Sequence, residues 1–288
     1  MTPPALHLYS LQPDLPRLLR LAARERLLPP GDDPGYAIHA VLAAAFGALA
    51  PKPWALLAPG QGGGAGGRLL GYGAEPLEAL LAHAATYADP QFSSVLALDR
   101  AAVRPMPTYF APGTRLGFRV RLRPVARTGK PIPGHPSAAE RGDRGRERDV
   151  FLARVEAAGR ALAAAGGPPP SSSGEAPPPG AQSRAACYLE WLDARLADQG
   201  ARLAPTCAPD GSEHAWDARV EGFRLTRLLS RDRSGGGARS RFAEGPDALV
   251  TGTLIVADRD AFAAGIARGV GRYRAFGFGM LLLTPPRG

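Results

Sequence analysis

Hydrophobic and polar positions follow two spacings along the N-terminal third of the chain. Apolar residues that recur every three or four positions predict helices, and strict alternation or short apolar runs predict strands. In chain order the pattern predicts a strand at 5–11, helices at 13–28 and 33–50, strands at 54–58 and 68–73, a helix at 75–88 and a strand at 93–99. Apart from one extra helix, this is the split βαβ order of a ferredoxin-like domain.

The same order begins again after residue 110. It comprises a strand at 114–125, a helix followed by a strand at 183–203, strand material at 214–229 and 247–258, a helix at 259–270 and a final strand at 279–286. We therefore predict an α+β protein of two tandem ferredoxin-like (βαββαβ, RRM-like) domains, spanning 1–110 and 111–288.

The second predicted domain is interrupted between its first strand and its first helix. Residues 150–166 have helical periodicity, whereas 166–183 are rich in Pro, Gly and Ser and lack the apolar residues needed to order themselves. We expect a partly disordered insertion at about 131–182. We also expect a loop at 230–241, whose sequence is rich in Gly and Arg.

The charge balance favours a polyanionic partner. The chain has 35 Lys and Arg against 26 Asp and Glu, a net charge of +9, and Lys52 and Lys130 are its only lysines. Because arginine grips phosphates with a two-pronged fork and stacks on bases, this balance indicates nucleic acid first and an acidic membrane surface second. An arginine-rich genome composition explains the preference for Arg over Lys equally well.

Other classes of protein are disfavoured by absent motifs. Cys187 and Cys207 are the only cysteines and form no CxxC, which excludes a zinc ribbon or a disulfide framework and fits a reducing compartment. The five histidines show no metal-ligand spacing, so no metal and no cofactor are predicted. No apolar run is long enough to span a membrane and no signal peptide is recognisable, so a soluble, cytoplasmic protein is expected.

The stretch DDPGYAIHAVLAAAFG contains a candidate acid–base pair. Asp33 is predicted as the N-cap and Pro34 as the first residue of a helix. Tyr36 and His39 lie three positions apart at the edge of its apolar stripe, so both side chains address one point near the helix N-terminus, where amides and the helix dipole favour an anion. From spacing alone, a half-buried histidine and tyrosine beside the core is the favoured interpretation.

A glycine-rich stretch near the C-terminus, RGVGRYRAFGFGMLLL, is the second candidate. Its glycines permit close approach of backbone to a ligand, and its arginines suit phosphates. The residues concerned are Gly269, Gly271, Gly277, Gly279, Arg268, Arg272 and Arg274. The spacing is wrong for a dinucleotide-binding GxGxxG. A glycine-rich turn that packs a helix against a strand would explain the glycines but not the arginines.

A row of arginines forms the third candidate. In the strand at 114–125, Arg119, Arg121 and Arg123 alternate with apolar residues and share one face, which suits contact with a nucleic-acid backbone. Arg127 and Lys130 extend the positive run. A merely solvated strand face is the competing interpretation.

Together these stretches resemble the CasE-type CRISPR repeat-RNA endoribonucleases, the crRNA-processing subunits of subtype I-E systems. The resemblance is carried by YAIH in the first long helix, by GFRVRLRP with the following TGK, and by GTLIVAD and GVGRYRAFGFGMLLL near the C-terminus. It extends over most of the chain except 131–182 and 231–244. The last block, which is similar to the glycine-rich loop of that family, is the most specific.

The resemblance implies metal-independent cleavage of the repeat hairpin in precursor CRISPR RNA, by attack of a ribose 2′-hydroxyl on the adjacent phosphate. It implies His39 as the proton-transfer group and Tyr36 as its partner, with basic residues, among them Arg127 and Lys130, opposing the charge of the transition state. It implies a CRISPR repeat RNA hairpin and other subunits of a multi-protein CRISPR surveillance complex as partners, and no membrane.

Two other functions remain open at this point. A non-catalytic RNA-binding subunit of a CRISPR effector complex would share the folds, the arginines and the glycine loop. A ferredoxin-like metabolic regulator is disfavoured by the net charge and by the arginines that flank the glycines.

Overall fold

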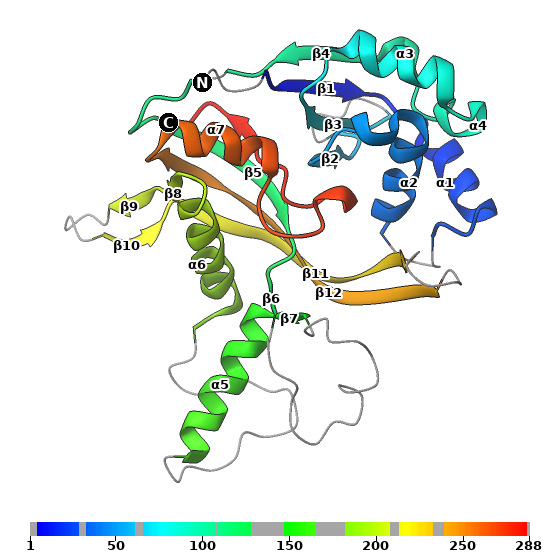
Figure 1. Cartoon of the computed structure of the whole chain (residues 1–288). Coiled ribbons are helices and arrows are strands. Elements are labelled where there is room, and N and C mark those ends of the chain that lie inside the picture. Colours follow the sequence, from blue (N-terminus) through cyan, green and yellow to red (C-terminus); the bar gives the residue numbers. More distant parts are fainter. Residues whose placement is uncertain are drawn as a thin grey trace.

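The structure is a computed structural model. It describes residues 5–28, 33–60, 66–107, 109–127, 147–164, 182–207, 213–232 and 239–286. Figure 1 shows two sheets, each with helices on one face, and a segment after the last helix that passes between them.

The N-terminal unit is built on one four-stranded antiparallel sheet. Its elements are β1 (His7–Leu11), α1 (Leu15–Arg24), α2 (Gly35–Phe46), η1 (Gly47–Leu49), β2 (Trp54–Leu57), β3 (Arg68–Gly73), α3 (Leu77–Tyr87), α4 (Pro90–Ser93), η2 (Leu98–Arg100) and β4 (Ala102–Pro105). The strand order β2-β3-β1-β4, with each strand antiparallel to its neighbours, is that of a ferredoxin-like fold.

One element of this unit was predicted wrongly. The stretch 93–99 is not a strand: it contains the end of α4, a turn and the start of η2, and the last strand follows at β4. Val95 and Leu96 are apolar because they are buried in the core beneath α1 and α2, not because they alternate across a sheet. A short apolar run does not distinguish these two environments.

The C-terminal unit repeats the arrangement with longer strands. Its elements are β5 (Arg115–Leu122), α6 (Arg184–Ala197), β8 (Ala201–Leu203), β11 (Ala218–Asp232), β12 (Arg239–Val256), α7 (Arg259–Arg268), η3 (Arg274–Phe276) and β13 (Leu282–Thr284). The order is β11-β12-β5-β13, and β8 also pairs with β12, so β8 and β11 together take the place of the second strand. A hairpin of β9 (Pro205–Cys207) and β10 (Glu213–Trp216) separates them. The predicted tandem fold is confirmed.

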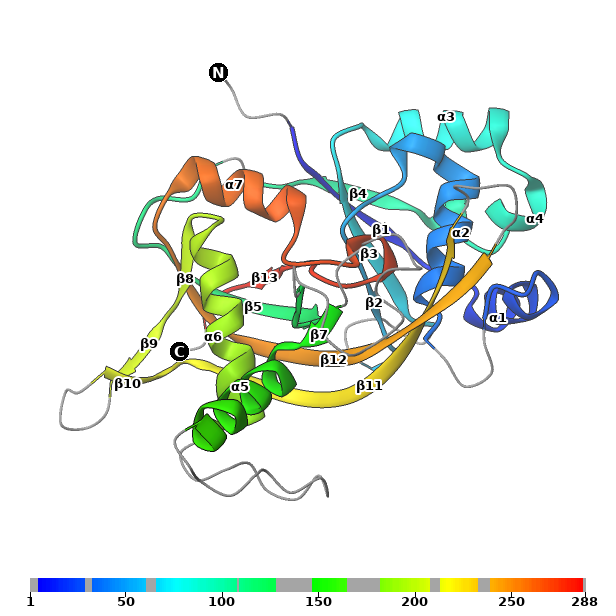
Figure 2. The same ribbon diagram turned by 60° about the horizontal axis from the view of Figure 1, so that its bottom comes forward.

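The β11–β12 hairpin is longer than the sequence predicted. Antiparallel pairing continues to Asp232 opposite Arg239, so residues 230–232 and 239–241 belong to strands although a loop was expected at 230–241. Residues 233–238 lie outside the described part of the chain. Figure 2 shows the hairpin sweeping from the C-terminal sheet towards the helices of the N-terminal unit, and α2 contacts β11.

Part of the predicted insertion is also ordered around β5 and α6. β6 (Val125–Arg127) pairs with β7 (Glu147–Asp149), and α5 (Val150–Ala164) follows and packs against α6. Buried Asp149 accepts hydrogen bonds from Tyr188 Oη at 2.8 Å and from Arg184. The rest of the expected disordered segment lies outside the described residues.

One buried cluster contains residues of both units. Leu8 and Tyr72 of the first sheet belong to the same buried cluster as Phe118 of β5, and the Tyr72 hydroxyl donates to the carbonyl of Leu281 at 2.8 Å. The Trp54 indole donates to the carbonyl of Ala275 at 2.9 Å. The segment after α7 therefore contributes to the contact between the units. The predicted division at residue 110 falls between β4 and β5 and stays a prediction.

Candidate cleavage site and nucleic-acid interface

The tyrosine and histidine of α2 lie beside the glycine-rich segment. The ring of Phe276 is nearly parallel to that of Tyr36, with centroids 6.1 Å apart, and meets the imidazole of His39 edge-on at 5.2 Å. The Tyr36 and His39 rings are 6.4 Å apart, and both residues are half-buried. Two stretches separated by more than two hundred positions, found separately in the sequence, thus form one aromatic site around an imidazole.

The helix that carries this pair follows the predicted pattern. Its expected apolar stripe, comprising Ile38, Val41, Leu42, Ala45 and Phe46, is buried. This burial leaves Tyr36 and His39 at the edge of the core, where they are neighbours on the helix surface.

The predicted start of α2 needs a correction. The N-cap residue is Pro34, one residue after the predicted Asp33, and it provides no side-chain cap. Asp33 Oδ1 nevertheless accepts the Gly35 amide at 2.8 Å. The negative group next to the first turn of this helix is therefore the protein's own carboxylate, whereas the sequence suggested a ligand anion at that point.

The glycines of the C-terminal segment shape a tight loop. All four have φ between 73° and 84°, the left-handed region that suits glycine. A Cβ on Gly279 would lie 2.1 Å from the carbonyl oxygen of Val270, and one on Gly277 would lie 2.7 Å from the Trp54 ring. The packing role considered for Gly269, Gly271, Gly277 and Gly279 is thus evident, and contact with RNA stays a prediction for them.

The arginines of this loop remain at the surface. Arg268 and Arg272 are exposed and Arg274 is partly exposed. Arg274 donates to the carbonyl of Arg268 at 2.6 Å, and Arg272 pairs with Glu147 of β7 at 2.6 Å. These contacts hold the guanidinium groups of Arg272 and Arg274 along the rim of the loop that bears Phe276.

Tyr273 and Glu147 fasten the loop to β7. Tyr273 has φ of 62°, its hydroxyl donates to Glu147, and its ring lies 4.9 Å from the Arg123 guanidinium. Burial, followed by the hydrogen bond to Glu147 and its charge, raises the pKa of Tyr273 to about 12. The sequence did not single out Glu147, because the long insertion hides its relation to the loop.

The arginine row on β5 is not a uniform solvent-facing stripe. Arg119 and Arg121 do share the face opposite buried Phe118, Val120 and Leu122, as predicted, whereas Arg123 follows the end of β5. However, Arg123 is 2 % exposed and donates to the carbonyl of Thr226 at 3.2 Å. Arg119 is half-buried and so is not fully exposed to solvent either. The backbone of Arg127 lies in β6, and Lys130 is outside the described residues.

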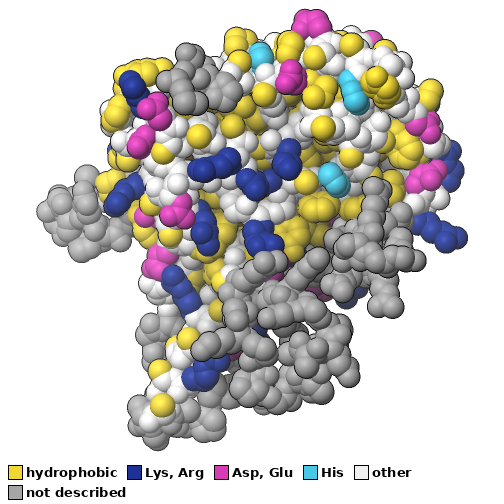
Figure 3. Space-filling model, viewed as in Figure 1, with side chains coloured by type: hydrophobic (Ala, Val, Ile, Leu, Met, Phe, Trp, Pro, Cys, Tyr) yellow, Lys and Arg dark blue, Asp and Glu magenta, His cyan; other side chains and the backbone are white. Residues whose placement is uncertain are grey.

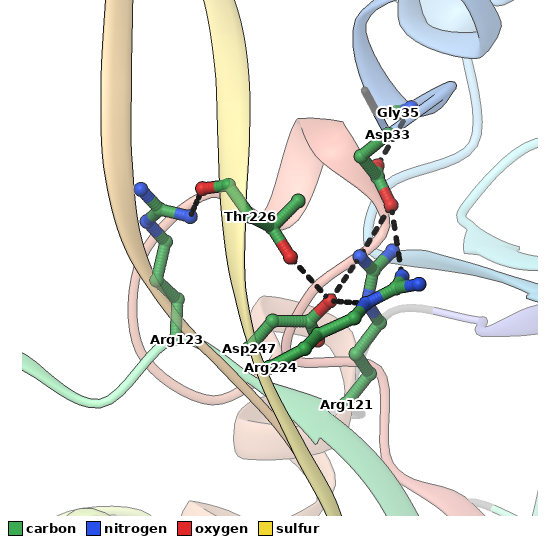
Figure 4. A network of polar contacts seen from close by, with 7 residues as sticks. All are labelled: Asp33, Gly35, Arg121, Arg123, Arg224, Thr226 and Asp247. Carbon is green, nitrogen blue, oxygen red and sulfur yellow. Dashed lines mark hydrogen bonds and ion pairs between the residues drawn. The ribbon is translucent and has the colours of Figure 1, made fainter. Parts of the chain in front are cut away.

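Arg121 belongs to a network of two arginines and two aspartates (Figure 4). It binds Asp247 through two nitrogens, at 2.9 and 2.7 Å, and Asp33 at 2.5 Å. Arg224 of β11 reaches both carboxylates, at 2.7 Å to Asp247 and 3.4 Å to Asp33. Asp247 and Arg224 were not predicted as site residues, since nothing in their local sequence distinguishes them from other charged strand residues.

The network has a clear electrostatic effect. Burial by itself would raise the pKa of Asp247, but hydrogen bonds from Arg121, Arg224 and Thr226 outweigh it and lower the pKa to about 2. The same two aspartates keep the pKa of Arg121 above its ordinary value, although burial opposes this. Asp247 and Arg121 are therefore both ionised throughout the neutral range.

The surface around the site is hollowed and basic. Two clefts, of about 420 and 510 Å³, both include Asp33, Pro34 and Arg224 in their lining. Figure 3 shows Lys and Arg side chains gathered across the middle of the face, with a histidine at the edge of that group. Such a surface suits a polyanion that crosses from one unit to the other.

The described residues add two further findings. No helix in these ranges combines the length and apolar character needed to cross a bilayer. The same ranges contain no group of three or more His, Cys, Asp or Glu residues that could hold a metal ion.

The fold and the site define an α+β protein of two ferredoxin-like units, with a histidine and aromatic rings at the edge of an arginine-rich surface. The family model for "CRISPR associated protein" matches residues 15–285, so the chain belongs to this family, as its sequence predicted.

Solved structures share the whole fold. A CRISPR endoribonuclease Cse3 bound to a 19-nucleotide RNA aligns with a TM-score of 0.56 at 21 % identity, over 98 % of this chain and 100 % of that one. Thermus thermophilus Cse3, bound to an RNA representing a pre-cleavage complex, aligns with a TM-score of 0.52 at 21 % identity over the same shares. At this identity the likeness establishes the fold. No curated protein matches the chain.

Proposed function

We propose that this protein is a metal-independent endoribonuclease that cleaves the repeat hairpins of precursor CRISPR RNA to give mature crRNA. The observation that carries the proposal is the position of His39 and Tyr36 against Phe276 of the glycine-rich loop, beside surface arginines. Membership of a CRISPR-associated family, and a fold shared with Cse3 endoribonucleases whose structures contain RNA, support this substrate.

The reaction needs proton transfer and stabilisation of negative charge. The 2′-oxygen of the ribose attacks the adjacent phosphorus, the bond from phosphorus to the 5′-oxygen breaks, and the products end in a 2′,3′-cyclic phosphate and a 5′-hydroxyl. One proton leaves the 2′-hydroxyl and one is delivered to the departing 5′-oxygen. His39 performs one of these transfers, and Tyr36 orients the attacking group or donates to a phosphorus oxygen.

The aromatic surroundings suit this role. Phe276 restricts the imidazole to one side of α2, and a rotamer fixed by packing keeps a general acid or base in reach of its proton. Positioned acid–base transfer contributes about 10²–10⁴-fold to a rate. The remainder must come from in-line geometry imposed on the bound hairpin and from nearby cations.

The arginines divide into two groups in this proposal. Arg268, Arg272 and Arg274 lie at the rim of the loop and contact RNA phosphates, together with Arg119, Arg127 and Lys130. Arg121 and Arg123 are held by protein partners and shape the site instead of binding RNA. Association with other subunits of a CRISPR surveillance complex, and action in the cytoplasm, also belong to the proposal.

A cleavage assay with the repeat RNA of the same CRISPR locus, in EDTA, tests the function. Cleavage at one position with cyclic-phosphate and 5′-hydroxyl ends is expected, and a 2′-deoxy substitution at the attacking ribose should abolish it. His39→Ala should lose cleavage while it still binds the repeat.

A matched control is available in the same unit. His83 lies on α3 with its ring 5.0 Å from Tyr87, so His83→Ala also removes an imidazole from a histidine–tyrosine contact, away from the loop. It should cleave like the unmodified protein. Binding without cleavage by the unmodified protein would instead identify a non-catalytic RNA-binding subunit.

A further inference from the structure

The second residue before α2 is bound to the C-terminal sheet. Asp33 is almost fully buried, with its side chain 2 % exposed. One carboxylate oxygen accepts the Gly35 amide at 2.8 Å, and the other accepts a hydrogen bond from Arg121 at 2.5 Å. A single side chain thus joins the first turn of α2, in the N-terminal unit, to the central strand β5 of the other unit (Figure 4).

Arg121 also organises the glycine-rich loop. Its guanidinium lies 4.2 Å from the centre of the Phe278 ring, and its carbonyl oxygen accepts the Gly279 amide at 2.7 Å. Asp247 of β12 holds the same guanidinium through two hydrogen bonds. Arg121 therefore touches three segments: the start of α2, the loop and the long hairpin.

The helix and the loop approach each other closely at Gly35. A Cβ placed on Gly35 would lie 2.5 Å from the carbonyl oxygen of Phe276. Tyr36 follows directly and His39 lies one turn further along α2. A shift of the helix start relative to the loop is hence transmitted to both rings, since the intervening helical turn is rigid.

The charges in this network oppose an RNA-binding role for Arg121. Two carboxylates and two guanidinium groups compensate one another, and the Arg121 side chain is only 24 % exposed. A phosphate would have to displace two buried aspartates to reach it, which costs more than an exposed arginine requires. The network is built to fix geometry.

We propose that Asp33 and Arg121 are positioning residues for RNA cleavage: their ion pair fixes the start of α2 against the glycine-rich loop and thereby places Tyr36 and His39 beside Phe276. This inference rests on the proposed endoribonuclease function. It predicts that these two residues, which do not touch the reacting phosphate, affect the rate of the chemical step and leave the affinity for RNA unchanged.

The test compares single-turnover cleavage with affinity for the same repeat RNA carrying a 2′-deoxy group at the attacking ribose. Asp33→Asn keeps an oxygen for the Gly35 amide but removes one of the two carboxylate charges that hold Arg121, the one that ties it to α2. Because misplacement by about 1 Å costs about 10²-fold, we expect a rate loss of about 10- to 100-fold at saturating protein. The dissociation constant should change less than about twofold, since no RNA contact is lost.

Arg121→Lys is the second variant. It keeps the positive charge and the backbone contact to Gly279 but lacks the fork that joins two carboxylates, and the same pattern of slow cleavage with unchanged affinity is expected. Asp99→Asn is the matched control, because Asp99 pairs with Arg100 at the surface, with 77 % of its side chain exposed. It should behave like the unmodified protein.

The outcomes separate this inference from the proposed function. If His39→Ala cleaves at the normal rate, the proposed catalytic function of this site is refuted, and the positioning role with it. If His39→Ala is inactive while folded Asp33→Asn cleaves at the normal rate, only the positioning role is overturned. Weaker RNA binding with an unchanged rate at saturation would overturn it as well. Should circular dichroism show Asp33→Asn to be unfolded, Arg121→Lys decides by the same criteria.

Discussion

Protonation of Asp247 should lower the free energy of unfolding, by an amount that follows from the surroundings of this carboxylate. The carboxylate is 6 % exposed and accepts hydrogen bonds from Arg121, Arg224 and Thr226, which lower its pKa from 3.8 to about 2. A pKa difference of one unit corresponds to 1.36 kcal/mol, so the ionised form contributes about 2 kcal/mol to folding.

The sign of the pH dependence follows from the direction of the shift. Because the folded-state pKa is depressed, this contribution is fully present above the ordinary pKa of 3.8 and is lost as the pH falls through about 2. Asp247→Asn imitates the neutral state at every pH. The unmodified protein should hence exceed the variant in free energy of unfolding by at least about 2 kcal/mol at pH 6, because the variant also leaves Arg121 with one charged partner fewer.

Urea unfolding at several pH values between 6 and 2, followed by circular dichroism, measures this difference. Other carboxylates titrate in both proteins, so the difference in free energy of unfolding between the unmodified protein and Asp247→Asn isolates the contribution of Asp247. It should shrink steadily below pH 4. A difference that stays constant down to pH 2, or one that is absent at pH 6, would refute the reasoning from burial and hydrogen bonds.

Three further changes have defined consequences. Phe276→Ala should slow single-turnover cleavage about 10-fold because the imidazole loses its packing partner, with smaller effects for Phe276→Leu; equal rates for all three proteins would contradict this. Gly279→Ala should lower the free energy of unfolding by more than about 2 kcal/mol, since it adds a clash with Val270 to the strain of a positive φ. Gly60→Ala is the control: Gly60 also has a positive φ but has open space around it, so this variant should show the backbone strain alone. Arg268→Gln should reduce the slope of log Kd for RNA against log salt by about 1, as measured by filter binding, and an unchanged slope would remove this arginine from the interface.

The sequence predicted the fold because the relevant signals are local. The stripe from Ile38 to Phe46 and the alternation in β5 repeat with the periods of a helix and a strand, and each period marks the face that must be buried. Repetition of the element order then restricts the topology to two similar units. The prediction of a strand around Val95 and Leu96 was wrong because this apolar run has no period.

The site was predictable only in part, because its assembly depends on which faces of the two units meet. Tyr36 and His39 were recognised within one helix, and the arginines of the loop within one segment. That Phe276 lies against both rings, and that Asp33 meets Arg121 from a position 88 residues away, depends on packing between the units. The alternation in β5 correctly placed Arg119 and Arg121 on one face, but it carries no information about the carboxylates that bind Arg121 there.

This division among the arginines links stability to function. Residues that look equivalent in the sequence face different partners: Arg121 and Arg123 are enclosed by protein, whereas Arg268 and Arg272 are exposed. Enclosed cations have been desolvated on folding and are held by protein groups, so they add little attraction for RNA but resist movement of the segments that they join. Exposed cations retain their attraction for phosphate and are screened by salt. Salt should consequently weaken binding of the repeat far more than it slows cleavage of RNA that is already bound.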